Sequence, residues 1–153
     1  MPNKDVHRPI GVAVGGAYAC IRAGSHPWEH VAVEIIGGLA GGWLGAALPD
    51  WVDPPTCPNH RHYGHGVLTV AGTVAVTAEF ILDLQHRLRY RADELAQNRI
   101  YLRDDFARLI NWIEELLLRF LVGMLNGITA GYISHLALDA FTPSSLPIFV
   151  RGF

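Results

Sequence analysis

Three histidines and an arginine gather in one short stretch, NHRHYGHG, which follows the acidic, proline-rich run LPDWVDPPTCP. His60 and His65 offer imidazole nitrogens, which together with carboxylate oxygens are the usual ligands of zinc and also suit manganese or iron. Arg61 could hold a phosphate or another oxyanion through two parallel hydrogen bonds. The stretch is therefore either part of a metal site with an anionic substrate or a solvated loop rich in histidine.

A second pair of ligand types lies near the C-terminal end of the chain. His135 and Asp139 are four residues apart, so on a helix they are neighbours on one face and can point at one ion. At the end of an apolar helix, either group would be costly without a partner. The pair indicates a metal site, with a capped or hydrogen-bonded helix terminus as the alternative.

Four helical segments are predicted to position these groups, over about 8–22, 28–48, 66–97 and 100–140. Pro49 is expected to end the second, and Thr142-Pro143 the fourth. Short connections favour an antiparallel up-down-up-down bundle, in which the starts of the first and third helices meet the ends of the second and fourth. The residues predicted to converge there are His7, Asp50, Asp53, His60, His65, His135 and Asp139.

Composition points to one domain, spanning 1–153, and toward the membrane. The chain is 50% hydrophobic and only 17% charged, against about 25% charged in ordinary soluble domains. A net charge of -2 gives no basic field that would gather nucleic acid. Apolar stretches at about 31–48, 67–82 and 116–138 approach the roughly 20 residues that a membrane span needs. Because Glu34, Arg119 and Asn126 interrupt these stretches, buried helices of a soluble protein remain the alternative.

Small residues recur at every fourth position in the second and fourth segments. The series are Gly37, Gly41 and Gly45; Gly38, Gly42 and Ala46; and Gly123, Gly127 and Gly131. Glycine in a helix costs about 1 kcal/mol relative to alanine, so the repeat needs a compensating reason. Close approach between helix backbones is that reason, and it is commonest in bilayers. The repeat therefore predicts tight helix crossings, with a soluble bundle as the other setting.

A charged segment at about 85–108 separates the last two apolar stretches. It is predicted to form a helical hairpin that turns near Asn98 and extends beyond the apolar slab. Under the positive-inside rule, its arginines place the tip in the cytoplasm; they are Arg87, Arg89, Arg91, Arg99, Arg103 and Arg108. The converging residues would then face the non-cytoplasmic side.

Four motifs follow one another in a characteristic order: Val-His at 6–7, Leu-Pro-Asp at 48–50, HRHYGHG at 60–66 and GYISHLALDAFTP at 131–143. In these motifs the chain resembles the predicted membrane-bound metal-dependent hydrolases of the YdjM type, over nearly its whole length. Two departures stand out: the second aspartate comes one residue later, as Asp53, and Gly64 and Gly66 replace hydroxyl residues. The resemblance implies a multi-pass inner-membrane helical protein with a metal centre and hydrolase activity.

The expected function is metal-assisted hydrolysis of a phosphodiester or ester bond in an anionic lipid or envelope-related substrate. One or two divalent ions, zinc or else manganese or iron, would activate a water molecule. Asp53 would act as general base or orient a ligand, and Arg61 would orient the substrate. The expected metal ligands are His7, Asp50, His60, His65, His135 and Asp139.

The rival from another class is a non-catalytic metal-binding membrane protein, which either transports ions or uses one to lock a helical assembly. A transporter would be expected to carry ionisable residues through the middle of its apolar helices, whereas these gather at the helix ends. Expected partners are membrane lipid and a small-molecule or lipid substrate, but not nucleic acid. Homo-oligomerisation stays open.

Overall fold

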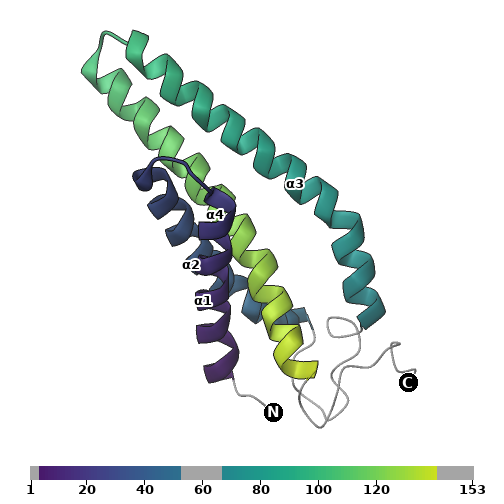
Figure 1. The fold of residues 1–153 in the computed structure, drawn as a ribbon. Helices are drawn as coiled ribbons and strands as arrows, with labels where there is room; N and C mark the ends of the chain where they lie inside the picture. The colour runs from purple at the N-terminus through teal and green to yellow at the C-terminus, as the bar shows by residue number, and fades with distance from the viewer. Residues whose placement is uncertain (1–3, 53–66, 141–153) are drawn as a thin grey trace.

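A computed structural model of the chain describes residues 4–52 and 67–140, with side chains described for 6–52 and 79–140. The described residues form four α-helices and one short 3-10 helix, and they contain no strand (Figure 1). The elements are α1 (Lys4–Ala23), α2 (Trp28–Val52), α3 (Val67–Asn98), η1 (Arg99–Tyr101) and α4 (Asp105–Ala140). The prediction of an all-α antiparallel bundle is confirmed.

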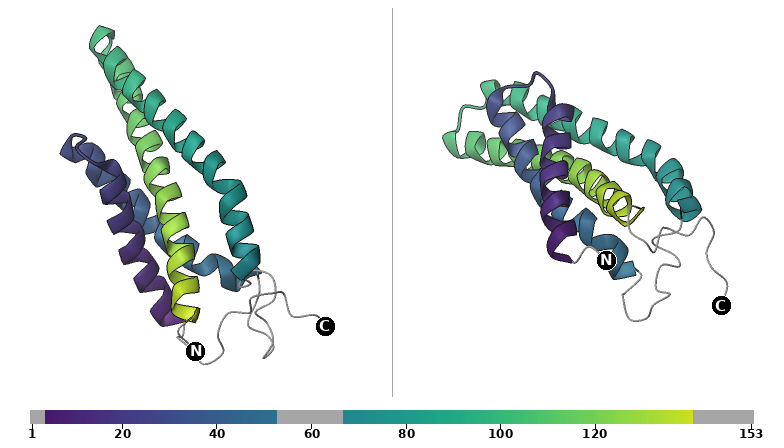
Figure 2. Two further views of the ribbon diagram at one scale, coloured as in Figure 1. Left: turned by 45° about the vertical axis from the view of Figure 1, so that its right-hand side comes forward. Right: turned by 60° about the horizontal axis from the view of Figure 1, so that its bottom comes forward.

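Three of the helices form the centre of the molecule, and the fourth lies to one side. α1, α2 and α4 pack against one another, whereas the backbone of α3 approaches α4 alone among the described α-helices. α3, η1 and α4 form a long hairpin whose tip extends well past α1 and α2 (Figures 1 and 2). This is the charged hairpin that the sequence predicted.

Glycines bring the three central helices into backbone contact. A Cβ atom added at Gly41 would meet the carbonyl oxygen of Met124 on α4, and one added at Gly42 would meet the carbonyl oxygen of Gly11 on α1. The two series in α2 therefore face different partners. Gly37, Gly41 and Gly45 face α4, while Gly38 and Gly42 face α1. The predicted close crossings are confirmed, because no side chain separates these backbones.

Two helix boundaries differ from the prediction. α2 does not stop at Pro49 but continues to Val52, and it changes direction toward its C-terminal end (Figure 2). A proline inside a helix removes one hydrogen bond and kinks it rather than always ending it. α4 begins at Asp105 rather than near residue 100, because Asp104 accepts a hydrogen bond from the Ala107 backbone N–H at 3.0 Å and so caps the helix.

Polar residues that interrupt the apolar helices pair with residues of the hairpin. Arg89 on α3 contacts buried Glu34 on α2, with Nη2 2.6 Å from Oε2. Glu115, also fully buried, contacts three groups at 2.9–3.1 Å: His30, Arg99 and Arg119. Arg119 reaches Asp93 on α3 at 2.8 Å. We call these seven residues the ion-pair network; its three carboxylates and three guanidinium groups cancel in formal charge.

Two described helices, α2 and α4, are long and apolar enough to cross a membrane by length and composition. Of their most apolar segments, 44% in α2 and 39% in α4 is buried inside the molecule, and the rest is partly or fully exposed. The third predicted apolar stretch, 67–82, consists mostly of residues whose side chains are not described. Its role as a span therefore stays a prediction.

Candidate metal centre

Three residues from the two extremes of the chain meet at one end of the central helices. His7 lies near the start of α1, and His135 and Asp139 lie in the last turns of α4. Their exposed fractions are 4%, 1% and 4%, respectively. The antiparallel course of the helices brings a start and an end together, and the four-residue spacing places His135 and Asp139 on one face. The predicted convergence of these three residues is confirmed.

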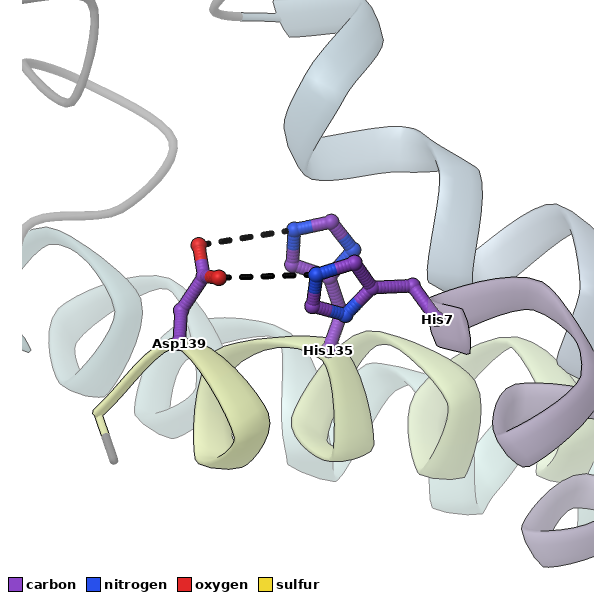
Figure 3. Close-up of side chains that lie close together, drawn as sticks. All are labelled: His7, His135 and Asp139. Carbon is purple, nitrogen blue, oxygen red and sulfur yellow. Dashed lines mark ion pairs between the residues drawn. The ribbon is translucent and has the colours of Figure 1, made fainter. Parts of the chain in front are cut away.

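The ligand atoms of the three residues lie within 4.8 Å of one another. Asp139 Oδ1 is 3.5 Å from His7 Nε2, and Asp139 Oδ2 is 3.7 Å from His135 Nε2, as the dashed lines in Figure 3 show. The two imidazole rings are stacked, with centroids 4.0 Å apart and planes inclined by 19°. The carboxylate therefore faces the same nitrogen of both rings.

The backbone of α2 fixes the orientation of His135. The Nδ1 atom of His135 lies 2.6 Å from the carbonyl oxygen of Ala46. A carbonyl oxygen can only accept a hydrogen bond, so Nδ1 carries the hydrogen and donates it. In the neutral ring, Nε2 then carries the lone pair, and this is the nitrogen that faces Asp139. A histidine held in this way by a carbonyl is typical of metal-binding proteins.

A fourth group, Asp50, lies beside His135. Its Oδ1 atom is 3.8 Å from His135 Nε2, and its side chain is 19% exposed. Because α2 continues past Pro49, Asp50 lies within the helix rather than beyond its end. Asp50 and Asp139 thus add two carboxylates to the imidazoles of His7 and His135, and together these groups form a donor set that suits a divalent cation.

The spacing of these groups suits a single small ion. Two ligands at about 2.1 Å from a tetrahedral zinc ion lie about 3.4 Å apart. The three observed separations between imidazole nitrogen and carboxylate oxygen, 3.5, 3.7 and 3.8 Å, are slightly longer. Nitrogen and oxygen donors without a thiolate also suit manganese or iron. The ligand atoms of His7, His135 and Asp139 lie within 4.8 Å of one another, so they fit one divalent metal ion once the side chains draw closer together.

Four of the predicted site residues lie outside the described part of the chain: Asp53, His60, Arg61 and His65. Their roles stay predictions. His86, in contrast, lies exposed on α3, away from the site. Sequence reasoning missed the contact between His135 and the Ala46 carbonyl, because a backbone group leaves no residue-type signal. The small side chain of Ala46, in the glycine series, was the available sign that another helix comes close there.

The helices and the buried histidine-aspartate cluster define a class, an α-helical membrane protein with a candidate metal centre. The chain belongs to the YdjM inner membrane protein family, whose sequence model it matches over residues 1–150. The resemblance seen in the four motifs is thus confirmed, and the family supports a membrane location. Neither a search of curated proteins nor a search of solved structures found a match.

Proposed function

We propose that this protein is a membrane-embedded metal-dependent hydrolase whose described metal ligands are His7, His135 and Asp139, with Asp50 beside them. One observation carries the proposal: three buried ligand groups from α1 and α4 have ligand atoms within 4.8 Å of one another. When bound, a divalent ion at this position would act as a Lewis acid and lower the pKa of a water molecule.

The chain's own residues would hold and orient this centre. The hydrogen bond from His135 Nδ1 to the Ala46 carbonyl turns Nε2 toward Asp139, and the stacked ring of His7 limits how far either imidazole can rotate. Asp139 faces both rings. Asp53, as general base, and Arg61, as a clamp for an anion, are added to the proposal from the sequence, as are the ligands His60 and His65.

Donor chemistry distinguishes this site from the ion-pair network. In that network every carboxylate contacts an arginine, so its residues neutralise one another. At the metal centre Asp139 and Asp50 instead face imidazole nitrogens of His7 and His135. Carboxylate oxygens beside imidazole nitrogens form a donor set that suits a divalent ion, which supports a metal site.

The proposed substrate is a phosphodiester or ester of an anionic lipid or envelope precursor. The proposed setting is a multi-pass inner-membrane protein with its site on the non-cytoplasmic side, opposite the arginine-rich hairpin. Labelling of Cys57 in oriented vesicles with a membrane-impermeant thiol reagent would test this orientation. Labelling from the cytoplasmic face alone would contradict it.

A second candidate function is a metal that only locks the helices together. The favouring observation is that the three ligands join α1 to α4, which are far apart in sequence, and are almost wholly enclosed. Both functions require the bound ion. They differ in whether a substrate can reach it, because a metal that only locks the helices needs no access for a substrate.

Elemental analysis of purified protein tests the metal centre. Wild type should carry one or two zinc, manganese or iron ions, and both His135→Ala and His7→Ala should lose them. His86→Ala removes an exposed histidine and is the matched control, which should keep the metal. Metal-free wild type, even after incubation with each ion, would contradict the proposal. Hydrolysis of phosphodiester and ester substrates by the loaded protein would then separate the enzyme from the structural lock.

A further inference from the structure

An arginine and two tryptophans lie together beside the metal centre, on the outer side of α1 and α2. The guanidinium carbon of Arg8 is 4.9 Å from the ring centroid of Trp43. Trp43 in turn meets Trp51 edge to face, with centroids 6.4 Å apart. Trp43 is 40% and Trp51 is 54% exposed, although both are large and apolar. We call these three residues the Arg–Trp patch.

The patch is tied to the metal centre through neighbouring residues in the chain. Arg8 directly follows the buried His7, and Trp51 directly follows Asp50. Successive side chains on an α-helix point about 100° apart, so one turns inward and the next turns toward the outer surface. The same two turns of helix therefore hold the candidate ligands inside and the Arg–Trp patch outside.

The patch carries a positive charge that the described part of the chain does not neutralise. Within residues 6–52 and 79–140, no carboxylate forms an ion pair with Arg8. Arg8 lies over the face of the Trp43 ring, an arrangement that leaves the outward hydrogen-bond donors of the guanidinium available to an anion. Charge complementarity thus favours a negatively charged ligand at an aromatic, partly apolar surface.

The position of the patch along α2 matches a membrane interface. Trp28, which is 81% exposed, and Trp51 lie at opposite ends of α2, separated by about 35 Å along a straight helix. The hydrocarbon core of a bilayer is about 30 Å thick, and tryptophan is enriched at both of its boundaries. Ile36 and Leu39, exposed between them, would face lipid tails.

From this arrangement we infer that the Arg–Trp patch binds the phosphate headgroup of an anionic phospholipid. Arg8 contacts the phosphate, while Trp43 and Trp51 lie at the level of the glycerol and the first acyl carbons. The lipid is thereby held at the mouth of the metal centre. Its use as a substrate subsite rests on the proposed function, whereas lipid binding itself does not require the metal.

Fluorescence quenching by lipids tests the inference. A protein carrying Trp28→Phe and Trp112→Phe keeps Trp43 and Trp51 as its emitters, and it is titrated in detergent with brominated phosphatidylglycerol or brominated phosphatidylcholine. We expect half-maximal quenching at an anionic lipid concentration about fivefold lower than that of the zwitterionic lipid. Arg8→Ala should abolish this preference, and Arg8→Lys should retain part of it.

Controls keep lipid and metal effects apart. Arg22→Ala removes an exposed arginine from the last turn of α1, far from the patch, and should keep the preference. His135→Ala should lose the metal but keep the preference, and Arg8→Ala should keep the metal. Equal quenching by both lipids in the parent protein would overturn the inference. The inference would also be overturned if Arg8→Ala and Arg8→Lys both kept the full preference for the anionic lipid. Complete displacement of that lipid by inorganic phosphate at an equal concentration would overturn it as well.

Discussion

The Nδ1 atom of His135 donates a hydrogen bond to the carbonyl oxygen of Ala46, 2.6 Å away on a different helix. This contact couples the last turns of α4 to Ala46, the last member of the small-residue series of α2. It also decides which imidazole nitrogen is available to a metal ion, because a neutral imidazole carries only one hydrogen. The site therefore depends on helix packing as well as on its ligands.

The tautomer of His135 is the first prediction. In protein without metal, nitrogen NMR should find a hydrogen on Nδ1, because the Ala46 carbonyl can only accept. Added zinc should shift the Nε2 resonance and leave Nδ1 protonated. A hydrogen on Nε2 with none on Nδ1 in the metal-free protein would show that the Ala46 contact does not hold the ring in solution.

Metal affinity should fall as the solution is acidified. Imidazole ligands bind metals in their neutral form, so protons compete with the ion for both His7 and His135. Zinc titrations between about pH 8 and pH 5 should show weaker binding at each lower pH, with protons released on binding. An affinity that does not change over this range would exclude histidine ligands. The exposed His86 offers a check, since its replacement should leave the profile unchanged.

A methyl group added at Gly41 should push α2 away from α4, whereas one added at Gly16, where α1 meets α2, should be tolerated. In Gly41→Ala the new Cβ meets the backbone carbonyl of Met124, which cannot move aside. The free energy of unfolding should fall by about 1–3 kcal/mol, as for other overpacked positions. The matched control is Gly16→Ala, whose Cβ meets side-chain atoms of Leu39 and Ile35 and no backbone atom among its nearest neighbours. Equal stability of the two variants in detergent unfolding would contradict the predicted crossing.

Removal of one charge from the ion-pair network should be costly. Glu115→Gln leaves Arg99, Arg119 and His30 facing a neutral group in a fully buried position. Breaking a buried ion pair typically costs about 3–5 kcal/mol, so a large loss of thermal stability is expected. Glu94→Gln, which breaks only an exposed pair with Arg91, should change stability little. Similar melting temperatures for the two variants would mean that the network is not stabilising.

Periodic small residues allowed much of the fold to be predicted. A glycine at every fourth position has few uses in a helix other than close backbone contact, and the crossings of α2 with α1 and α4 follow that pattern. Helix ends were less predictable. Pro49 was expected to end α2, yet the helix continues with a bend, so Asp50 lies on the helix near His135.

The partners of the polar residues that interrupt the apolar helices were harder to predict. Glu34, Arg119 and Asn126 each break an apolar stretch, and the sequence alone left open whether they argue against a membrane. The structure pairs Glu34 with Arg89, and Asn126 accepts a hydrogen bond from Gln85 at 3.1 Å. Such partners lie 41 or more residues away, so residue spacing on one helix could not reveal them. The only local sign of such partners was that an unpaired charge inside an apolar helix is energetically costly.

For the site, residue type and helix direction together were sufficient to bring His7, His135 and Asp139 to one end. The antiparallel order of the helices accounts for their lying at the same end, whereas their contact requires α1 and α4 to be direct neighbours. The stacking of the two imidazoles and the role of Ala46 could not be predicted, because both depend on how closely α1 and α4 approach α2.

α2 packs against both helices that carry ligands, so its glycines set how closely α1 and α4 can approach it. Gly42 contacts Gly11, which lies one turn beyond His7 on α1. A methyl group at position 42 would push α1 outward and widen the opening between His7 and His135 without touching either. We expect such a chain to bind a larger ion in preference to a smaller one, so that Gly42 would influence the choice of metal without contacting it.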